Sequence, residues 1–225
     1  MHVKLTCKYL GTKFHGFAAQ NRARTVQGEL EAALSKYFGQ TIKTVGAGRT
    51  DAGVHAEGQV VSFLLPSKSE KTFDAKEFVF EVNNLLPKDI SVRDAELKEK
   101  FNARQAAKSK TYIYKCYVGS RRDTSREETQ FWLKNRPDIS AMRKAAAELV
   151  GTHDFTKFCV DRDGKNPVRT VSDFTVEERG DEIWFTIRGE NFLKKQVRMM
   201  VGYLLNPAEV TAVPAKGLTL YCIEF

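Results

Sequence analysis

The 225-residue sequence predicts an α+β fold, a mixed or antiparallel sheet flanked by helices. Two observations support this class. Segments with the two-residue period of strands interleave with segments of helical period along the whole chain. Some strands also have one polar face: Ile183, Phe185 and Ile187 alternate with Trp184, Thr186 and Arg188. Because strands of a wholly parallel sheet are buried on both faces, this alternation favours antiparallel or mixed pairing.

The N-terminal elements follow from periodicity and capping residues. Residues 3–9 alternate apolar and polar side chains, which predicts a half-buried strand. Thr25 is a good N-cap for the helical pattern of 26–38, and Gly39 stands where a helix ends. A strand is expected at 60–65.

Asp74 and Glu77 form a capping pair, which predicts a helix that buries Phe78 and Val82 and ends before Pro87. The second half is expected to contain a strand at 111–118, a helix at 139–150, strands at 168–177 and 183–188, and a helix at 191–205.

The chain is expected to divide into two α/β halves, 1–104 and 105–225, because the charged stretch around 98–110 is poor in apolar residues.

The charge distribution indicates a polyanionic partner. The net charge is +8, with 36 Lys and Arg against 28 Asp and Glu. Residues 1–50 carry eight basic and two acidic residues, and residues 101–136 carry nine and three. Two such segments can line one anionic track, such as a central basic cleft that binds nucleic acid, although solvated basic faces are the alternative.

Several protein classes are disfavoured. The four cysteines are far apart and form no C-x-x-C pair, so neither a zinc site nor a disulfide scaffold is indicated. No apolar run approaches the length of about 20 residues that a membrane span needs, and the N-terminus lacks a signal-peptide pattern. A reducing cytoplasm is the expected compartment.

The run 45–56 (VGAGRTDAGVHA) is the segment most suited to chemistry. Its three glycines bracket Arg49 and Asp51, so the loop can present a carboxylate on a constrained backbone. It does not match a dinucleotide-binding fingerprint, because Asp51 stands where the third glycine belongs. A hydrolase triad built on His153 and Asp154 is also disfavoured, because the chain has no Gly-x-Ser-x-Gly nucleophile turn.

The sequence resembles the tRNA pseudouridine synthase A family along its whole length. The GRTDAGVHA stretch is similar to the active-site signature of that family, and further matching motifs occur in the family's order. They are YLGTxFxGF from Tyr9, RTVQGEL from Arg24, NLLP from Asn84, FNAR from Phe101, KTYxY from Lys110, GTHDF from Gly151, NFL from Asn191, VRMMVG from Val197 and PAxGL from Pro214.

The resemblance implies a cofactor-free isomerase that converts uridine to pseudouridine in tRNA, at anticodon stem-loop positions 38 to 40, and that acts as a homodimer. It identifies Asp51 as the catalytic carboxylate, with Arg49 in the same loop. Tyr112 would pack on the reacting base, and Arg198 would pair with Asp51. No metal or small-molecule cofactor and no membrane is implied.

These residue types suit the reaction. An ionised carboxylate can act as a covalent nucleophile or remove a sugar proton, and the sequence leaves both routes open. A guanidinium opposes the pKa rise that desolvation causes in a carboxylate, and Arg198 lies beside the apolar stripe of the helix expected at 191–205. Extruding the target base from RNA requires an aromatic or apolar surface, which Tyr112 can supply, while Tyr114 is expected in the core.

Six basic residues are candidate RNA contacts: Lys108, Lys110, Arg121, Arg122, Lys194 and Lys195. Two alternative functions remain open, namely a non-catalytic RNA-binding protein and a pseudouridine synthase that acts on another RNA. The carboxylate of Asp51 disfavours the first, because it would repel phosphate. The segment 206–213 is shorter than is usual in the family, which bears on substrate choice and dimerisation.

Overall fold

The computed structural model describes residues 1–160, 164 and 166–225 of the chain. The chain divides into two compact units, with residues 1–107 and 222–225 in unit 1 and residues 108–221 in unit 2. Among the described residues, the strand pairs of defined register are antiparallel, apart from one short parallel pair in unit 2. The predicted α+β class is confirmed.

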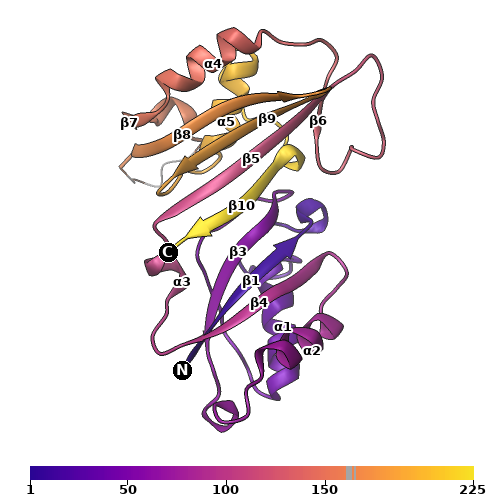
Figure 1. Cartoon of the computed structure of the whole chain (residues 1–225), viewed down its shortest axis with the longest axis vertical. Coiled ribbons are helices and arrows are strands. Elements are labelled where there is room, and N and C mark those ends of the chain that lie inside the picture. Colours follow the sequence, from indigo (N-terminus) through magenta and orange to yellow (C-terminus); the bar gives the residue numbers. More distant parts are fainter. Residues whose placement is uncertain (161–163, 165) are drawn as a thin grey trace. The chain divides into compact units, whose positions relative to one another are not determined.

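Unit 1 contains a sheet with strand order β4-β1-β3 and two long helices (Figure 1). Its elements are β1 (His2–Tyr9), η1 (Gly11–Lys13), α1 (Val26–Phe38), β2 (Val45–Gly46), β3 (His55–Leu64), η2 (Ser67–Ser69), α2 (Ala75–Leu85), β4 (Ile90–Lys98) and α3 (Ala103–Ala106). The two-residue β2 pairs with β3. Fully buried side chains from β1, α1 and α2 form the core.

The capping residues of unit 1 act as predicted. The Thr25 side chain accepts a hydrogen bond from Gly28 N, and Gly39 ends α1 at φ +65°. The Asp74 side chain accepts from the backbone N–H groups of Lys76 and Glu77, which fixes the start of α2. Leu86 is extended, as the residue before Pro87 usually is, so α2 stops at Leu85.

Strand β4 was not predicted, and a β-bulge explains why. The buried residues of β4 are Ile90, Val92 and Ala95, so buried positions switch from even to odd residue numbers along the strand. The β1–β4 register shifts between Thr6 and Cys7, which is where the bulge absorbs the extra residue. A strict two-residue pattern therefore does not appear in the sequence of this strand.

Unit 2 contains a sheet with order β5-β9-β8-β7, with β6 paired to β5 in parallel (Figure 1). Its elements are β5 (Ser109–Val118), β6 (Phe131–Leu133), α4 (Ile139–Glu148), β7 (Gly151–Asp154), η3 (Thr156–Phe158), β8 (Val168–Arg179), β9 (Glu182–Gly189), α5 (Gln196–Leu205) and η4 (Ala215–Gly217). Strand β10 (Leu218–Glu224) starts in unit 2, and its last residues belong to unit 1.

The predicted one-sided sheet is confirmed in β9. Ile183, Phe185 and Ile187 are fully buried, whereas the alternate residues Trp184, Thr186 and Arg188 are half-buried or exposed. Tyr114 of β5 is also fully buried, and its hydroxyl donates to the Pro214 carbonyl at 2.9 Å. Tyr114 is therefore a core residue, as predicted.

The last predicted helix begins later than expected, at Gln196 rather than at 191. Lys195 adopts φ +62°, a left-handed conformation that interrupts helical geometry. The Gln196 side chain accepts a hydrogen bond from Leu193 N at 2.8 Å, which stabilises the turn before the helix. In the described part of the chain no helix has both the length and the apolar composition of a membrane span.

Candidate active site

The Asp51 loop lies in unit 1 and connects β2 to β3. Arg49 is exposed, Thr50 is buried and Asp51 is half-buried. The loop thus presents a cation and a carboxylate on either side of one buried anchor residue.

Backbone hydrogen bonds hold this loop on the segment that follows β1. Phe17 N donates to Thr50 O at 3.1 Å, and Gly53 N donates to Phe14 O at 3.3 Å. Val54 N donates to Asp51 O at 3.2 Å, which closes a turn with Gly53 at φ +80°. The main chain on both sides of the Asp51 side chain is therefore fixed.

Two glycines allow the segment 11–17 to approach the loop this closely. Gly16 has φ +95°, and a Cβ atom on it would lie 2.9 Å from Thr50 O. A Cβ on Gly11 would lie 2.0 Å from Val54 O. Because these neighbours are backbone atoms, they cannot move aside as a flexible side chain could, and only glycine fits at either position.

A buried polar cluster anchors the loop from beneath. The Tyr9 hydroxyl is 2.8 Å from Thr50 Oγ1, and Gln59 Nε2 donates to Gly48 O at 3.0 Å and to Tyr9 Oη at 3.4 Å. Burial raises the pKa of Tyr9 well above its usual range, and the hydrogen bonds from Thr50 and Gln59 offset part of that rise. Tyr9 is therefore a neutral hydrogen-bonding group at physiological pH.

This cluster is not evident from the sequence pattern. Tyr9 fits an apolar position of its strand, and Gln59 belongs to no motif. The one signal in the sequence is that Gln59 directly precedes the apolar run from Val60, and the structure shows that Gln59 is fully buried. A buried amide requires polar partners.

Two histidines of the sequence motifs, His55 and His153, have structural contacts. His55 is buried, and its Nδ1 accepts a hydrogen bond from Gly11 N at 3.0 Å. His153 Nε2 lies 2.8 Å from the Val150 carbonyl. Within the described residues, no group of three or more His, Cys, Asp or Glu side chains is placed to hold a metal ion.

Tyr112 lies on β5 in unit 2 and is only 7% exposed. Phe192 meets its ring edge-on, with centroids 5.5 Å apart and an interplanar angle of 86°. Lys110, on the same strand, donates from Nζ to the Glu190 carbonyl at 3.1 Å, and burial lowers the pKa of Lys110. Lys110 and Phe192 thus connect the turn after β9 to the part of β5 that carries Tyr112.

Arg198 lies on α5, and the segment 206–213 holds it. Its Nε donates to Val213 O at 2.7 Å, and Val213 N donates to Arg198 O at 3.3 Å. The approach is close, since a Cβ on Gly202 would lie 1.9 Å from Thr211 O. The segment 206–213 therefore orients the guanidinium of Arg198.

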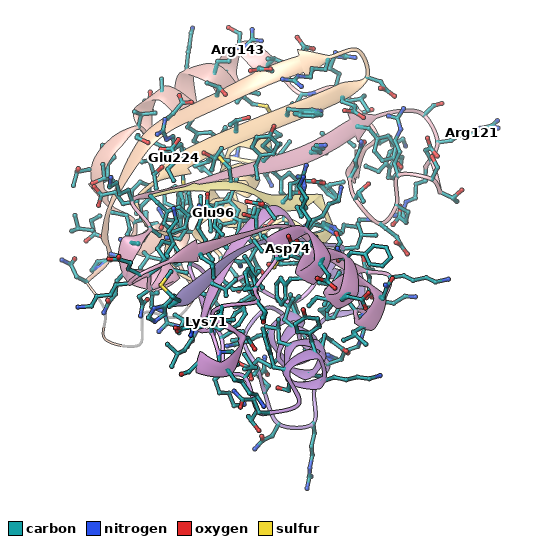
Figure 2. The ribbon with its side chains drawn as sticks, turned by 60° about the horizontal axis from the view of Figure 1, so that its bottom comes forward. Lys71, Asp74, Glu96, Arg121, Arg143 and Glu224 are labelled. Atoms are coloured by element: carbon teal, nitrogen blue, oxygen red, sulfur yellow. The ribbon has the colours of Figure 1, made fainter. Side chains whose placement is uncertain are left out.

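Arg121 and Arg122 are exposed on the loop between β5 and β6, and Figure 2 shows Arg121 extending away from it. The loop is anchored below them, because Asp123 N donates to Tyr117 Oη at 2.8 Å and Arg126 pairs with Asp181 at 2.8 Å. Lys108 and Lys194 are exposed, and Lys110 and Lys195 are half-buried. All six proposed RNA contacts belong to unit 2.

Known proteins match this chain over most of its length. The family model described as tRNA pseudouridine synthase matches residues 6–105 and 145–216. The protein named tRNA pseudouridine synthase A of Halalkalibacterium halodurans is 39% identical over 90% of this chain and 77% of its own length. The protein of the same name from Brevibacillus brevis is 40% identical over 96% of each chain.

A third relative with that name, from Thermosipho melanesiensis, is 41% identical over 88% of this chain and 80% of its own length. The solved structure entitled "Crystal Structure of a Cbf5-Nop10-Gar1 Complex" aligns with 97% of this chain over 48% of the matched chain's own length. The TM-score is 0.48 and the sequence identity is 13%, so this match adds nothing to the assignment. The match to the family model and the identity to these relatives together show that the chain belongs to the tRNA pseudouridine synthase family.

Proposed function

We propose that this protein is an isomerase that converts uridine to pseudouridine in tRNA, with Asp51 as the catalytic carboxylate. Family membership supports the reaction. The constrained loop supports the choice of residue, because Asp51 is the half-buried carboxylate whose flanking backbone is held by hydrogen bonds to Phe14 and Phe17. Fixing a reacting group in this way removes orientational freedom that would otherwise add to the barrier.

The reaction breaks the bond from ribose C1′ to uracil N1 and forms a bond from C1′ to C5. The C5 proton is then lost to solvent, and a proton is returned to N1, so there is no net redox change. An ionised Asp51 can either attack C1′ or remove a sugar proton, and both routes use the same carboxylate.

We propose supporting roles for three further residues, based on the family motifs in which they lie. Tyr112 provides aromatic surface for the extruded base, Arg198 compensates carboxylate charge, and Arg49 binds RNA through its planar cation. The anchored Nε of Arg198 supports a fixed orientation of its guanidinium. The exposure of Arg49 supports contact with a macromolecular ligand.

The finer points of the substrate and assembly are also proposals. The motif resemblance supports the anticodon stem-loop, positions 38 to 40, and a homodimer. The four free cysteines support a reducing compartment such as the cytoplasm. Sedimentation that finds only monomer at micromolar concentration would refute the dimer.

The decisive experiment measures tritium release from tRNA labelled at uridine C5, because forming the new bond expels that hydrogen. Wild type is expected to release tritium, and Asp51→Asn is expected to release none, since the amide keeps the shape but lacks the charge. Asp173→Asn, which removes an exposed carboxylate of β8, is the matched control and is expected to behave as wild type.

Other outcomes identify the alternatives. Release by Asp51→Asn equal to wild type would exclude Asp51 as the essential carboxylate. A wild type that binds tRNA without releasing tritium would favour a non-catalytic binding protein, and release from another labelled RNA alone would indicate a different substrate.

A further inference from the structure

Arg24 lies in unit 1, and all three of its guanidinium nitrogens bind carboxylates. Nη1 and Nη2 pair with the two oxygens of Asp89 at 2.7 and 2.8 Å. Nε pairs with Glu29 at 2.9 Å. The planar group also lies over the Phe14 ring, 4.2 Å from its centroid.

This arrangement differs from that of an RNA-contacting arginine. Its counterions come from within the protein, and the Asp89 side chain is only 20% exposed. The hydrogen bonds from Arg24 lower the pKa of Asp89, which keeps the pair ionised. Arg24 therefore adds to the basic count of residues 1–50 without being available as a free positive charge.

The contacts of Arg24 and Asp89 lead to the Asp51 loop. The ring of Phe14 is buried under the guanidinium, and the backbone carbonyl of Phe14 accepts the hydrogen bond from Gly53 N at 3.3 Å. His15 N donates to Arg24 O at 2.9 Å, and Leu10 N donates to Asp89 O at 3.0 Å. The segment that contacts the Asp51 loop is thus hydrogen-bonded at both ends to the main chain of the two residues whose side chains form this ion pair.

We propose that Arg24, held in a two-point pair by Asp89, is a positioning residue that fixes the backbone of the Asp51 loop for catalysis. The inference rests on the proposed role of Asp51. The proposal depends on the two-point geometry of the pair. Two parallel hydrogen bonds from a planar guanidinium to a carboxylate fix its orientation as well as its distance, whereas a lysine ammonium acts as a point charge.

Two conservative substitutions separate this proposal from RNA contact. Arg24→Lys keeps the positive charge but loses the paired Nη1 and Nη2 donors. Asp89→Asn replaces one of the two acceptor oxygens by an NH2 group, which breaks the two-point pair, and it removes no cation. Each is expected to lower kcat for tritium release about 10- to 100-fold with little change in KM, because a small displacement of a reacting group has effects of this size. If Arg24 instead contacts RNA, Asp89→Asn leaves kcat unchanged, and that result overturns the proposal.

Arg179→Lys is the matched control. Arg179 also binds a carboxylate through two nitrogens, at 3.1 and 2.8 Å to Glu177, and lies over an aromatic ring, 4.0 Å from the centroid of Trp184. It belongs to unit 2, away from the loop in the chain, and its replacement is expected to leave kcat and KM unchanged. If either of the first two variants fails to fold, Glu29→Gln removes only the carboxylate charge beside Nε, leaves the Asp89 pair intact and is expected to lower kcat to a smaller extent.

An activity-independent measurement tests the same contacts. Amide hydrogen exchange in residues 46–56, which include the Gly53 N–H, is expected to be faster in Arg24→Lys and Asp89→Asn than in wild type. Exchange in β9 of unit 2 should not change. Unchanged exchange in the loop refutes the proposal, whereas an inactive wild type refutes only the proposed function and leaves this result interpretable.

Discussion

Replacing Tyr9 by Phe tests how the buried polar cluster supports the Asp51 loop. The change removes one oxygen and keeps the ring. Tyr9 is 2% exposed, Thr50 is 7% exposed and Gln59 is fully buried, so water cannot readily replace the lost hydroxyl. Its contacts are Thr50 Oγ1 at 2.8 Å and Gln59 Nε2 at 3.4 Å. Of the two partners, Gln59 keeps a second acceptor, the Gly48 carbonyl.

Thr50 therefore bears most of the penalty. Leaving one buried polar group unsatisfied costs about 1–3 kcal/mol, and that is the expected loss in the free energy of unfolding. Urea denaturation followed by circular dichroism measures it. Tyr221→Phe, at a tyrosine that is 51% exposed, is the control and should change stability by less than about 0.5 kcal/mol.

A double-mutant cycle makes the test specific. Once Tyr9 is Phe, Thr50→Val should cost less than it does in wild type, because the hydroxyl pair is already broken. Two results would refute the claim that this hydrogen bond anchors the loop. One is strictly additive losses in the free energy of unfolding for Tyr9→Phe and Thr50→Val, and the other is a Tyr9→Phe loss no larger than that of Tyr221→Phe.

Four further results are expected. Gly16→Ala should destabilise the protein by about 1–3 kcal/mol and lower kcat, measured by urea unfolding and tritium release, because φ +95° is strained for alanine and the new Cβ meets Thr50 O. Asp89 has a lowered pKa when folded, so its stabilising contribution is present above its unfolded pKa of about 4 and is lost as pH falls below it. The difference in unfolding temperature between wild type and Asp89→Asn should therefore narrow on acidification from pH 7, and a constant difference would contradict this reasoning. Joint replacement of Arg121 and Arg122 by Ala should flatten the slope of log affinity for tRNA against log salt by about 1 to 2, and an unchanged slope would remove both from the RNA path. Phe192→Ala should lower kcat by loosening Tyr112, whose ring it meets edge-on, whereas an unaltered kcat would show that this contact is dispensable.

Much of the fold could be predicted from local sequence. The start and end of α1 follow from Thr25 and Gly39, and the start of α2 follows from Asp74, since capping is an interaction between neighbours in the chain. The buried face of β9 follows from its alternation. Two elements were not predicted correctly. Strand β4 was not recognised because its bulge breaks the two-residue period, and α5 starts later than expected because Lys195 has a left-handed conformation.

The candidate residues came from motif resemblance, and the variants above test their roles. Local sequence could identify Asp51 because its loop combines glycines with charged residues in one short run. It could not show that Tyr9 and Gln59 contact that loop, because Tyr9 is 41 positions from its partner Thr50 and Gln59 is 11 positions from Gly48.

The sequence by itself therefore determined the α+β class, the main helix boundaries and the family to which the chain is similar, because these depend on short-range patterns of side chains. Only the tertiary structure decided which charges are available. Arg24 counts as one of eight basic residues in 1–50, yet folding places it against Asp89 and Glu29. The physical reason is that the availability of a charged side chain to a ligand depends on its neighbours in space. Asp89, the partner of Arg24, is 65 residues away along the chain.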